Sequence, residues 1–269
     1  MAAELITAYH ILHKHKVINE YGSVSIRNPH NPTTFMIGRR SALLTSSLDD
    51  LVERSVADGS IHQRPTQTEL TSQNTLNTEH FLHSCMYARY PEIRSVIHAQ
   101  STLGIVYGLC DASGSMLLPV YNRAGFVGDY TPIFDPARHY SLLPNSWPRD
   151  LTISHPVLGD AVARLLVGAG VNGERTLPDY GCVMLRGNGV ALWGDDIKHA
   201  VYKAVQLQRS TEIQAAAMLQ RAHSELGITY LTDIEVKDCE DLVRQSIAAH
   251  WDAWEVEVDR DSVYRNAFH

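Results

Sequence analysis

The sequence predicts a mixed α/β sandwich that forms a single domain. The chain has 269 residues, of which 44% are hydrophobic and 20% are charged, and this length and composition suit one large globular domain. Patterns typical of amphipathic helices alternate along the chain with short patterns typical of strands. Several strand patterns follow one another across tight turns, which indicates hairpins.

The N-terminal part is expected to contain one helix and several short strands. Leu5, Tyr9 and Leu12 lie at positions i, i+4 and i+7 of the segment 2–17, which predicts an amphipathic helix. The alternating pattern at 22–27 predicts a strand. The other elements expected here are a second strand at 34–37 and a brief helix at 48–52.

The middle of the chain contains the clearest helical pattern. A helix is expected to begin at a cap formed by Asn77 or Thr78 and to run to Tyr90, because Pro91 stops its continuation. The next elements are a strand at 94–100 and a helix at 102–109, for which Ser101 is the expected cap. The turn-rich stretch 111–150 is expected to form long loops around short strands.

The C-terminal part is expected to hold a helix, a hairpin and two longer helices. Asp195 is the expected cap of a long helix that ends near Arg221. Thr232 and Glu235 have the spacing of a capping box, which predicts a last helix ending near Trp254. The earlier elements are a helix at 157–167 and two strands, at 182–185 and 190–193, joined by a turn at 187–189.

Composition excludes several classes of function. The net charge of -7 disfavours a nucleic-acid binder, because such proteins use an excess of Lys and Arg against phosphates. The sequence contains no run of about 18 apolar residues, so no membrane span is expected. Its N-terminus lacks the pattern of a secretory signal, and its cysteines are far apart and form no C-x-x-C pair. These features predict a cytoplasmic protein with reduced, mostly buried thiols.

A small group of polar residues could carry chemistry. His98 and Gln100 are two residues apart on a predicted strand, so their side chains emerge on the same face. Glu79 lies near the start of a helix, and His83 follows at i+4, where it could hydrogen-bond to Glu79. Each residue also has an ordinary structural explanation; Asn188, for example, belongs to an Asn-Gly sequence of the kind that forms hairpin turns.

Taken together, these segments resemble the class II aldolase/adducin family. Residues 79–101 resemble its catalytic helix followed by the pattern Arg-x-Pro-x-x-x-x-Val-x-His-x-His-Ser, and residues 22–29 and 183–194 resemble its early strand and its late hairpin. Residues 118–121 and 132–135 resemble the branch that includes decarboxylases of aromatic acids. The likeness covers about residues 3–220.

The resemblance implies a class II aldolase-like fold, a three-layer α/β/α sandwich with a mixed, largely antiparallel central sheet. Residues 1–225 would form the family domain, and residues 226–269 would be a helical extension of the same domain. The family also implies a homotetramer with clefts at the subunit interfaces. The expected partners are therefore a small-molecule substrate and further copies of the chain.

The residues that bind the family's divalent cation are only partly kept. Three histidines bind it in the family, and the matching positions here are His98, Gln100 and Asn188. Glu79 matches the glutamate that acts as acid and base, and Ser23 replaces an asparagine used with phosphate-bearing substrates. One imidazole and one carboxylate fall short of the three protein ligands usual in a catalytic zinc site. We therefore expect no catalytic metal and no other cofactor.

These observations predict a metal-free enzyme. The amides of Gln100 and Asn188, with an N–H of His98, could stabilise an oxyanion, while Glu79 acts as general acid and base. The expected activity is that of a lyase or a cyclase/isomerase, making, breaking or rearranging C–C bonds of a small unphosphorylated keto or phenolic substrate. Specialised metabolism is the expected setting. Further substrate-binding residues expected are His83, Ser25 and Tyr121.

Two alternatives remain open at this point. The first is a metal-dependent aldolase or aromatic-acid decarboxylase with an altered site, in which oxygen ligands hold Zn²⁺, Mn²⁺ or Mg²⁺. The second is a non-catalytic interaction module like adducin. The absence of a long basic tail and the presence of Glu79 and His98 favour an enzyme.

Overall fold

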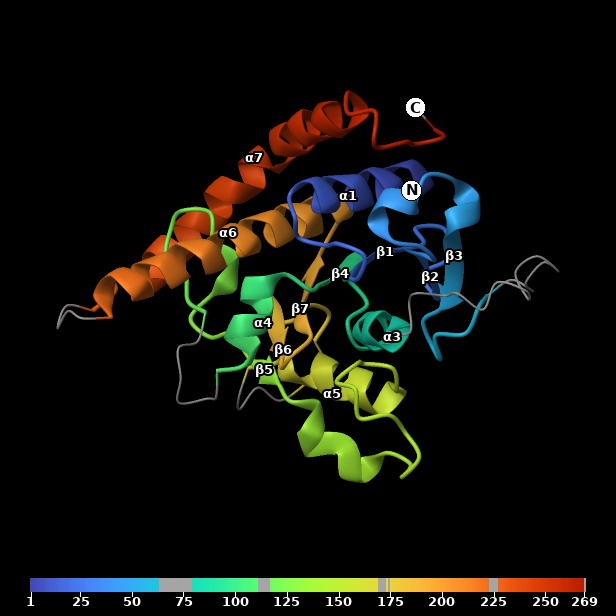
Figure 1. The fold of residues 1–269 in the computed structure, drawn as a ribbon, viewed down its shortest axis with the longest axis horizontal. Helices are drawn as coiled ribbons and strands as arrows, with labels where there is room; N and C mark the ends of the chain where they lie inside the picture. Colours follow the sequence, from blue (N-terminus) through green and yellow to red (C-terminus); the bar gives the residue numbers. More distant parts are fainter. Residues whose placement is uncertain (63–78, 111–116, 169–172, 174, 223–226, 269) are drawn as a thin grey trace.

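A single sheet forms the centre of the molecule. The computed structural model describes residues 1–62, 79–110, 117–168, 173, 175–222 and 227–268. The strands are β1 (Ser23–Arg27), β2 (Thr34–Gly38), β3 (Leu51–Ser55), β4 (Ser95–Ala99), β5 (Ile133–Phe134), β6 (Cys182–Leu185) and β7 (Gly189–Gly194). They form a seven-stranded sheet in the order β3-β2-β1-β4-β7-β6-β5 (Figure 1). Only the β5–β6 pair is parallel among these strands, which confirms the mixed, largely antiparallel sheet.

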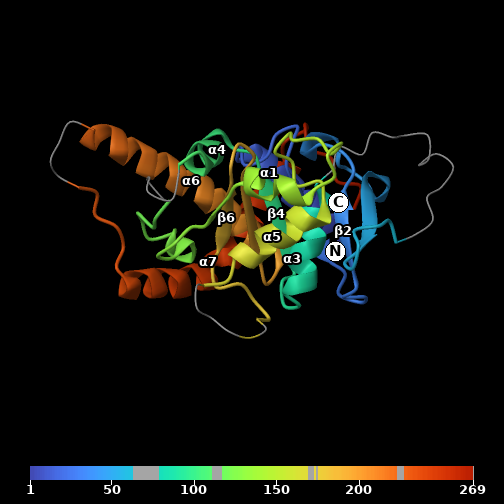
Figure 2. The ribbon, with the colours of Figure 1, turned by 90° about the horizontal axis from the view of Figure 1, so that it is seen from below.

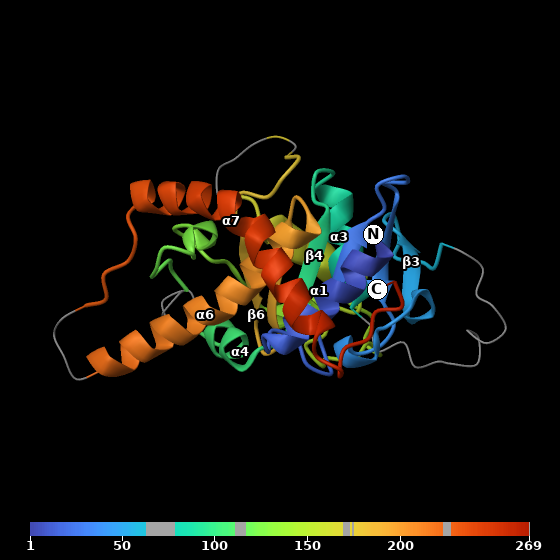
Figure 3. The ribbon, with the colours of Figure 1, turned by 90° about the horizontal axis from the view of Figure 1, so that it is seen from above.

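Helices cover both faces of the sheet. They are α1 (Ala2–Lys14), α3 (His80–Arg89), α4 (Thr102–Gly108), α5 (Pro156–Leu165), α6 (Ile197–Arg221) and α7 (Asp233–Asp259). From below, α3 and α5 lie in front of the sheet (Figure 2). From above, α1, α6 and α7 lie in front (Figure 3). Each face buries a hydrophobic cluster of its own, so the domain has the predicted α/β/α layers.

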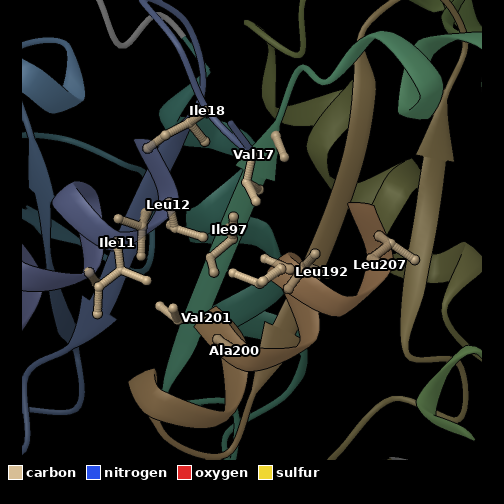
Figure 4. Close-up of a cluster of buried hydrophobic side chains, with 14 of the residues drawn as sticks. Ile11, Leu12, Val17, Ile18, Ile97, Leu192, Ala200, Val201 and Leu207 are labelled. Atoms are coloured by element: carbon tan, nitrogen blue, oxygen red, sulfur yellow. The ribbon is translucent and has the colours of Figure 1, made fainter. Parts of the chain in front are cut away.

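The alternation of side chains along β4 decides where its histidine points. Ile97 of β4 and Leu192 of β7 are directly paired and pack toward Leu12 of α1 and Val201 of α6 (Figure 4). Successive side chains of a strand face opposite sides of the sheet. His98 therefore faces the layer that contains α3 and α5.

The helix termini confirm some sequence predictions and correct others. Ser101 caps α4 by accepting a hydrogen bond from the backbone N–H of Gly104, as expected. The capping box of Thr232 at the start of α7 is also present. The predicted cap of α6 at Asp195 is wrong: Asp196 accepts the N–H of residue 199, while the carboxylate of Asp195 faces the side chain of His199.

Three further boundaries differ from the predictions. The last helix continues to Asp259 instead of ending near Trp254, because α7 packs along α1 and α6. The brief helix expected at 48–52 is a single 3₁₀ turn, Leu48–Asp50, which leads directly into β3. The caps expected at 77 and 78 lie outside the described residues, and α3 begins with Glu79 at its N-cap position.

The loops beyond residue 116 follow the sequence prediction, and the cysteines follow it only in part. Beyond residue 116 the loops hold the short strand β5 and the 3₁₀ helices Gly125–Val127 and Pro136–Leu142. All four cysteines are free thiols, but only Cys182 is buried, so the expectation that most of them are buried is wrong. No helix in the described part of the chain is both long enough and apolar enough to cross a membrane.

Candidate active site

Three segments meet at the end of β4 and bring four polar residues together. Glu79 stands at the N-cap of α3, His98 lies on β4 with Gln100 just beyond it, and Asn188 lies in the β6–β7 turn. This turn approaches β4 so closely that a Cβ at Gly189 would lie 2.0 Å from the carbonyl oxygen of Ala99. The close approach places Asn188 beside Gln100.

Glu79 is a buried carboxylate that accepts three hydrogen bonds. Its Oε2 lies 3.0 Å from Nδ1 of His98, and its Oε1 accepts the backbone N–H of Ile153 at 2.7 Å and Nδ2 of Asn188 at 2.6 Å. Burial alone would raise the pKa of Glu79, but the charge of His98 and these hydrogen bonds lower it to about 2. The carboxylate is therefore held in its ionised form.

His98 is held as the protonated partner of this carboxylate. Its Nε2 lies 2.8 Å from the backbone carbonyl oxygen of Asn188, which can only accept, so Nε2 carries a proton. Burial would lower the pKa of His98, but the charge of Glu79 and the hydrogen bonds raise it above its ordinary value. Both ring nitrogens therefore donate, and the pair is an imidazolium and a carboxylate.

The two amides serve this ion pair instead of forming a separate oxyanion site. Gln100 donates through Nε2 to Oδ1 of Asn188 at 2.5 Å, and Asn188 donates through Nδ2 to Glu79. The negative charge that the amide of Asn188 stabilises directly is thus the carboxylate of Glu79. The expectation that both amides and His98 point at a common substrate oxyanion is not what the geometry shows, because the N–H groups of His98 and Asn188 already have partners within the protein. Gln100 uses one of its two amide N–H groups on Asn188.

The same geometry tests whether the residues fit the family's divalent cation. A metal-bound imidazole needs one nitrogen with a free lone pair, and both nitrogens of His98 are occupied by Glu79 and Asn188. No group of three or more His, Cys, Asp or Glu side chains suited to a metal ion occurs in the described part of the chain. The residues of this site therefore do not fit a zinc ion.

A loop that the sequence did not reveal completes the network. Leu151 has a left-handed backbone with φ 69°, a conformation that costs energy in a non-glycine residue. Its carbonyl oxygen accepts from Nδ2 of Asn188 at 3.3 Å, and two residues later the N–H of Ile153 reaches Glu79. The strained turn thus supplies backbone partners to both side chains.

A cavity of about 160 Å³ opens onto this network. The ion pair, Gln100 and Ser23 line it, and Ser23 is the direct cross-strand neighbour of His98. Sequence reasoning did not assign the other lining residues to the site. These are Tyr9, Glu20, Tyr21, Gly22, Gly38, Arg40 and Thr152.

His83 and Ser25 lie next to the site but are completely buried. The suggested bond between His83 and Glu79 is not present: Nε2 of His83 pairs with Ser23 Oγ at 2.8 Å and Nδ1 pairs with Ser25 Oγ at 2.7 Å. Burial, followed by the charge of His98, lowers the pKa of His83 to about 3. A neutral His83 therefore orients Ser23, and it reaches the cavity only through that serine.

Tyr121 is not part of this cavity. Its hydroxyl donates to Oε1 of Gln206 on α6 at 2.7 Å, and its ring packs on the hydrophobic cluster of the opposite face of the sheet. The sheet therefore separates Tyr121 from the face of His98, and the side chain anchors a loop to α6.

Comparison with known proteins places the fold and the motifs in one family. The sequence profile of the class II aldolase and adducin N-terminal domain matches residues 3–215. The chain belongs to this family, as the segments around Glu79 and His98 predict.

Individual relatives include a lyase close in length to this chain. Decarboxylase tropJ from Talaromyces stipitatus is 32% identical over 271 residues, covering 97% of this chain and 95% of the relative. An aldolase II superfamily protein from Pseudomonas syringae has a TM-score of 0.67 at 19% identity and covers 98% of this chain and 93% of its own. L-fuculose 1-phosphate aldolase from Glaciozyma antarctica also has a TM-score of 0.67, at 14% identity, with 98% and 91% covered. Both structures share the fold of this chain.

Proposed function

We propose that this chain is a lyase that removes CO₂ from a small, unphosphorylated carboxylic acid bearing a keto or phenol group. The observation that carries the proposal is the buried pair of Glu79 and His98, which lines a cavity and holds a proton between its two members. The similarity to a decarboxylase along nearly the whole chain supports this reaction over other lyase reactions.

Decarboxylation of such a substrate requires that the protein bind the acid and deliver one proton. The bond between the carboxylate carbon and its neighbour breaks, CO₂ leaves, and the electron pair remains on the substrate. An adjacent keto or phenol group delocalises this pair. One proton must then be delivered to the carbon that lost the carboxylate, so the overall reaction consumes one proton and releases one CO₂.

The ion pair supplies this proton. The proton between Nδ1 of His98 and Oε2 of Glu79 is the mobile one, because Nε2 of His98 is held by the carbonyl of Asn188. After transfer, His98 is neutral beside an ionised Glu79, and uptake of a proton from water restores the pair. Glu79 thus raises the proton affinity of His98 and orients its ring, which makes the two residues one acid–base unit.

We also propose that this reaction proceeds without a resident divalent cation. Support comes from the occupied nitrogens of His98 and from the amides at the two other ligand positions, Gln100 and Asn188. In a site of this kind, the delocalising group of the substrate itself accommodates the developing charge.

The proposal is tested by CO₂ release from a panel of acids. The purified chain is incubated with 2,3-, 2,4- and 2,6-dihydroxybenzoate, acetoacetate and oxaloacetate, and CO₂ is measured against the Glu79→Gln variant. Glu92→Gln, which alters an exposed carboxylate, is the matched control. Release that depends on Glu79 and not on Glu92 supports the proposal, while no enzymatic release from any acid of the panel contradicts it.

A further inference from the structure

We infer that Arg40 is the carboxylate-binding residue of this cavity, so that the substrate binds as an anion with its carboxylate on the Arg40 guanidinium. The inference rests on the proposed function and deepens it by assigning the charge and the anchoring group of the substrate. Arg40 is independent of the Glu79–His98 pair, because it follows β2, a strand that carries neither member of the pair, and lines the same cavity.

The guanidinium of Arg40 is both anchored and accessible. Its Nε lies 3.2 Å from Oδ1 of Asp50, and the side chain nevertheless remains 60% exposed. Anchoring through Nε leaves the edge formed by the two terminal nitrogens for a ligand. That edge presents two parallel N–H groups, the geometry that matches the two oxygens of a carboxylate.

Asp50 is itself fixed in place, which fixes Arg40. Its Oδ2 accepts hydrogen bonds from the backbone N–H and the hydroxyl group of both Ser46 and Ser47, at distances of 2.9 to 3.1 Å. Burial would raise the pKa of Asp50, but these hydrogen bonds lower it. An ionised carboxylate that is held by four hydrogen bonds thus positions one side of the guanidinium before any ligand arrives.

The charges of the other lining residues make a cationic side chain necessary for the binding of an anionic substrate. Glu79 is neutralised by His98, whereas Glu20 adds a further negative charge to the lining. Arg40 is the only arginine or lysine among the described residues that line the cavity. A substrate carboxylate that binds here is therefore attracted by Arg40, and without Arg40 it would be repelled by the negative charge of Glu20.

The reaction adds a kinetic consequence. A carboxylate loses its charge as it becomes CO₂, so its ion pair with Arg40 is stronger in the bound substrate than in the transition state. Such an interaction increases affinity without accelerating the chemical step. Replacement of Arg40 is therefore expected to raise KM more than it lowers kcat.

The test compares a carboxylate with its neutral amide at equilibrium. Binding of salicylate and of salicylamide is measured by calorimetry or ligand-observed NMR for the wild type, Arg40→Gln, Arg40→Lys and Arg39→Gln. Arg39 is the control, since the substitution removes the same charge one residue away, where Nε donates to the carbonyl of Leu51. Thermal unfolding confirms that each variant is folded.

We expect the wild type and Arg39→Gln to bind salicylate about tenfold or more tightly than salicylamide, as one charge-assisted contact allows. Arg40→Gln should lose this preference, and Arg40→Lys should keep part of it. No preference in the wild type, no saturable salicylate binding, or an equal loss in Arg39→Gln and Arg40→Gln would overturn the inference. If CO₂ release dependent on Glu79 persists in those cases, the proposed decarboxylase function is supported and only the role of Arg40 fails. Salicylate binding through Arg40 without decarboxylation of any acid would support the role of Arg40 and contradict the proposed function.

Discussion

Oε2 of Glu79 and Nδ1 of His98 are 3.0 Å apart inside the protein, and the remaining polar atoms of both side chains are also occupied. In this site the imidazole of His98 and the carboxylate of Glu79 balance each other's charge and form a hydrogen bond with each other. A buried pair of this kind is stable only when hydrogen bonds compensate both charges, and Asn188 and Ile153 provide them. The consequence is a polar site prepared for proton transfer, and its properties can be tested one contact at a time.

The amide of Asn188 is expected to be essential because it donates to Glu79. Asn188→Asp keeps the shape but places a second carboxylate where Nδ2 now lies 2.6 Å from Oε1 of Glu79. Repulsion between the two carboxylates should raise the pKa of the pair and reduce CO₂ release by about 10²-fold, the lower end of what a positioned acid–base group contributes. Asn28→Asp is the control, since Nδ2 of Asn28 makes a similar 2.8 Å bond to Glu53 outside the cavity. Equal activity of the two variants would contradict this role.

The free energy of unfolding should decrease in acid, because Glu79 becomes protonated there. Its pKa falls from 4.5 to about 2 on folding, so its contribution is complete above pH 4.5 and disappears as the pH decreases toward 2. Breaking a buried pair by removing one partner costs about 3–5 kcal/mol, and we expect Glu79→Gln to lose about this much at pH 6. Urea unfolding of both proteins between pH 6 and pH 2.5 measures the difference. A difference that does not change with pH would argue against an ionised Glu79.

His83 should make the protein sensitive to acid in a different range. Its pKa is lowered from 6.5 to about 3, so below pH 6.5 the unfolded chain takes up a proton that the folded chain does not bind. Stability therefore decreases as the pH falls from 6.5 toward 3, by up to about 1.4 kcal/mol per pH unit. His83→Asn removes this group and should show a shallower decrease between pH 7 and pH 5 in urea unfolding. Parallel curves would indicate that His83 is protonated in the folded protein.

The position of the β6–β7 turn should depend on Gly189. This residue has φ 87°, and an added Cβ would lie 2.0 Å from the carbonyl oxygen of Ala99. Gly189→Ala should therefore destabilise the fold by at least about 1–3 kcal/mol from backbone strain and lower activity by displacing Asn188. Gly128→Ala is the control, because φ is 70° there and nothing lies within 4 Å of the added Cβ. Full activity of Gly189→Ala would show that the turn is not the positioning element.

Part of this site could be predicted from local patterns. The two-residue period of a strand places His98 and Gln100 on one face, a relation that depends only on a short sequence distance. Asn188 is far from both in sequence, and only the family resemblance indicates that it joins them. The local pattern predicts the cap at residue 77 or 78, and the N-cap position of Glu79 comes from the structure.

The remaining contacts depend on tertiary packing, which local spacing does not encode. His83 is one helical turn from Glu79, but β1 lies closer to its ring and supplies Ser23 and Ser25. The left-handed backbone of Leu151 has no sequence signal, because the residue is neither glycine nor asparagine. Arg40 and Arg39 are adjacent and chemically identical, so only the fold shows which one lines the cavity.

We propose that the positions which the family resemblance implies as cation ligands hold an internal ion pair in this chain and no resident metal. The most direct test of this claim is the metal content of the purified chain, measured by elemental analysis after purification without chelators and again after incubation with Zn²⁺ and Mn²⁺. The double variant Gln100→His, Asn188→His, which supplies three imidazoles with His98, serves as the reference. We expect the native chain to retain far less than one equivalent of either metal and to bind zinc more weakly than the reference. One tightly bound equivalent in the native chain, lost when His98 is replaced, would contradict the claim.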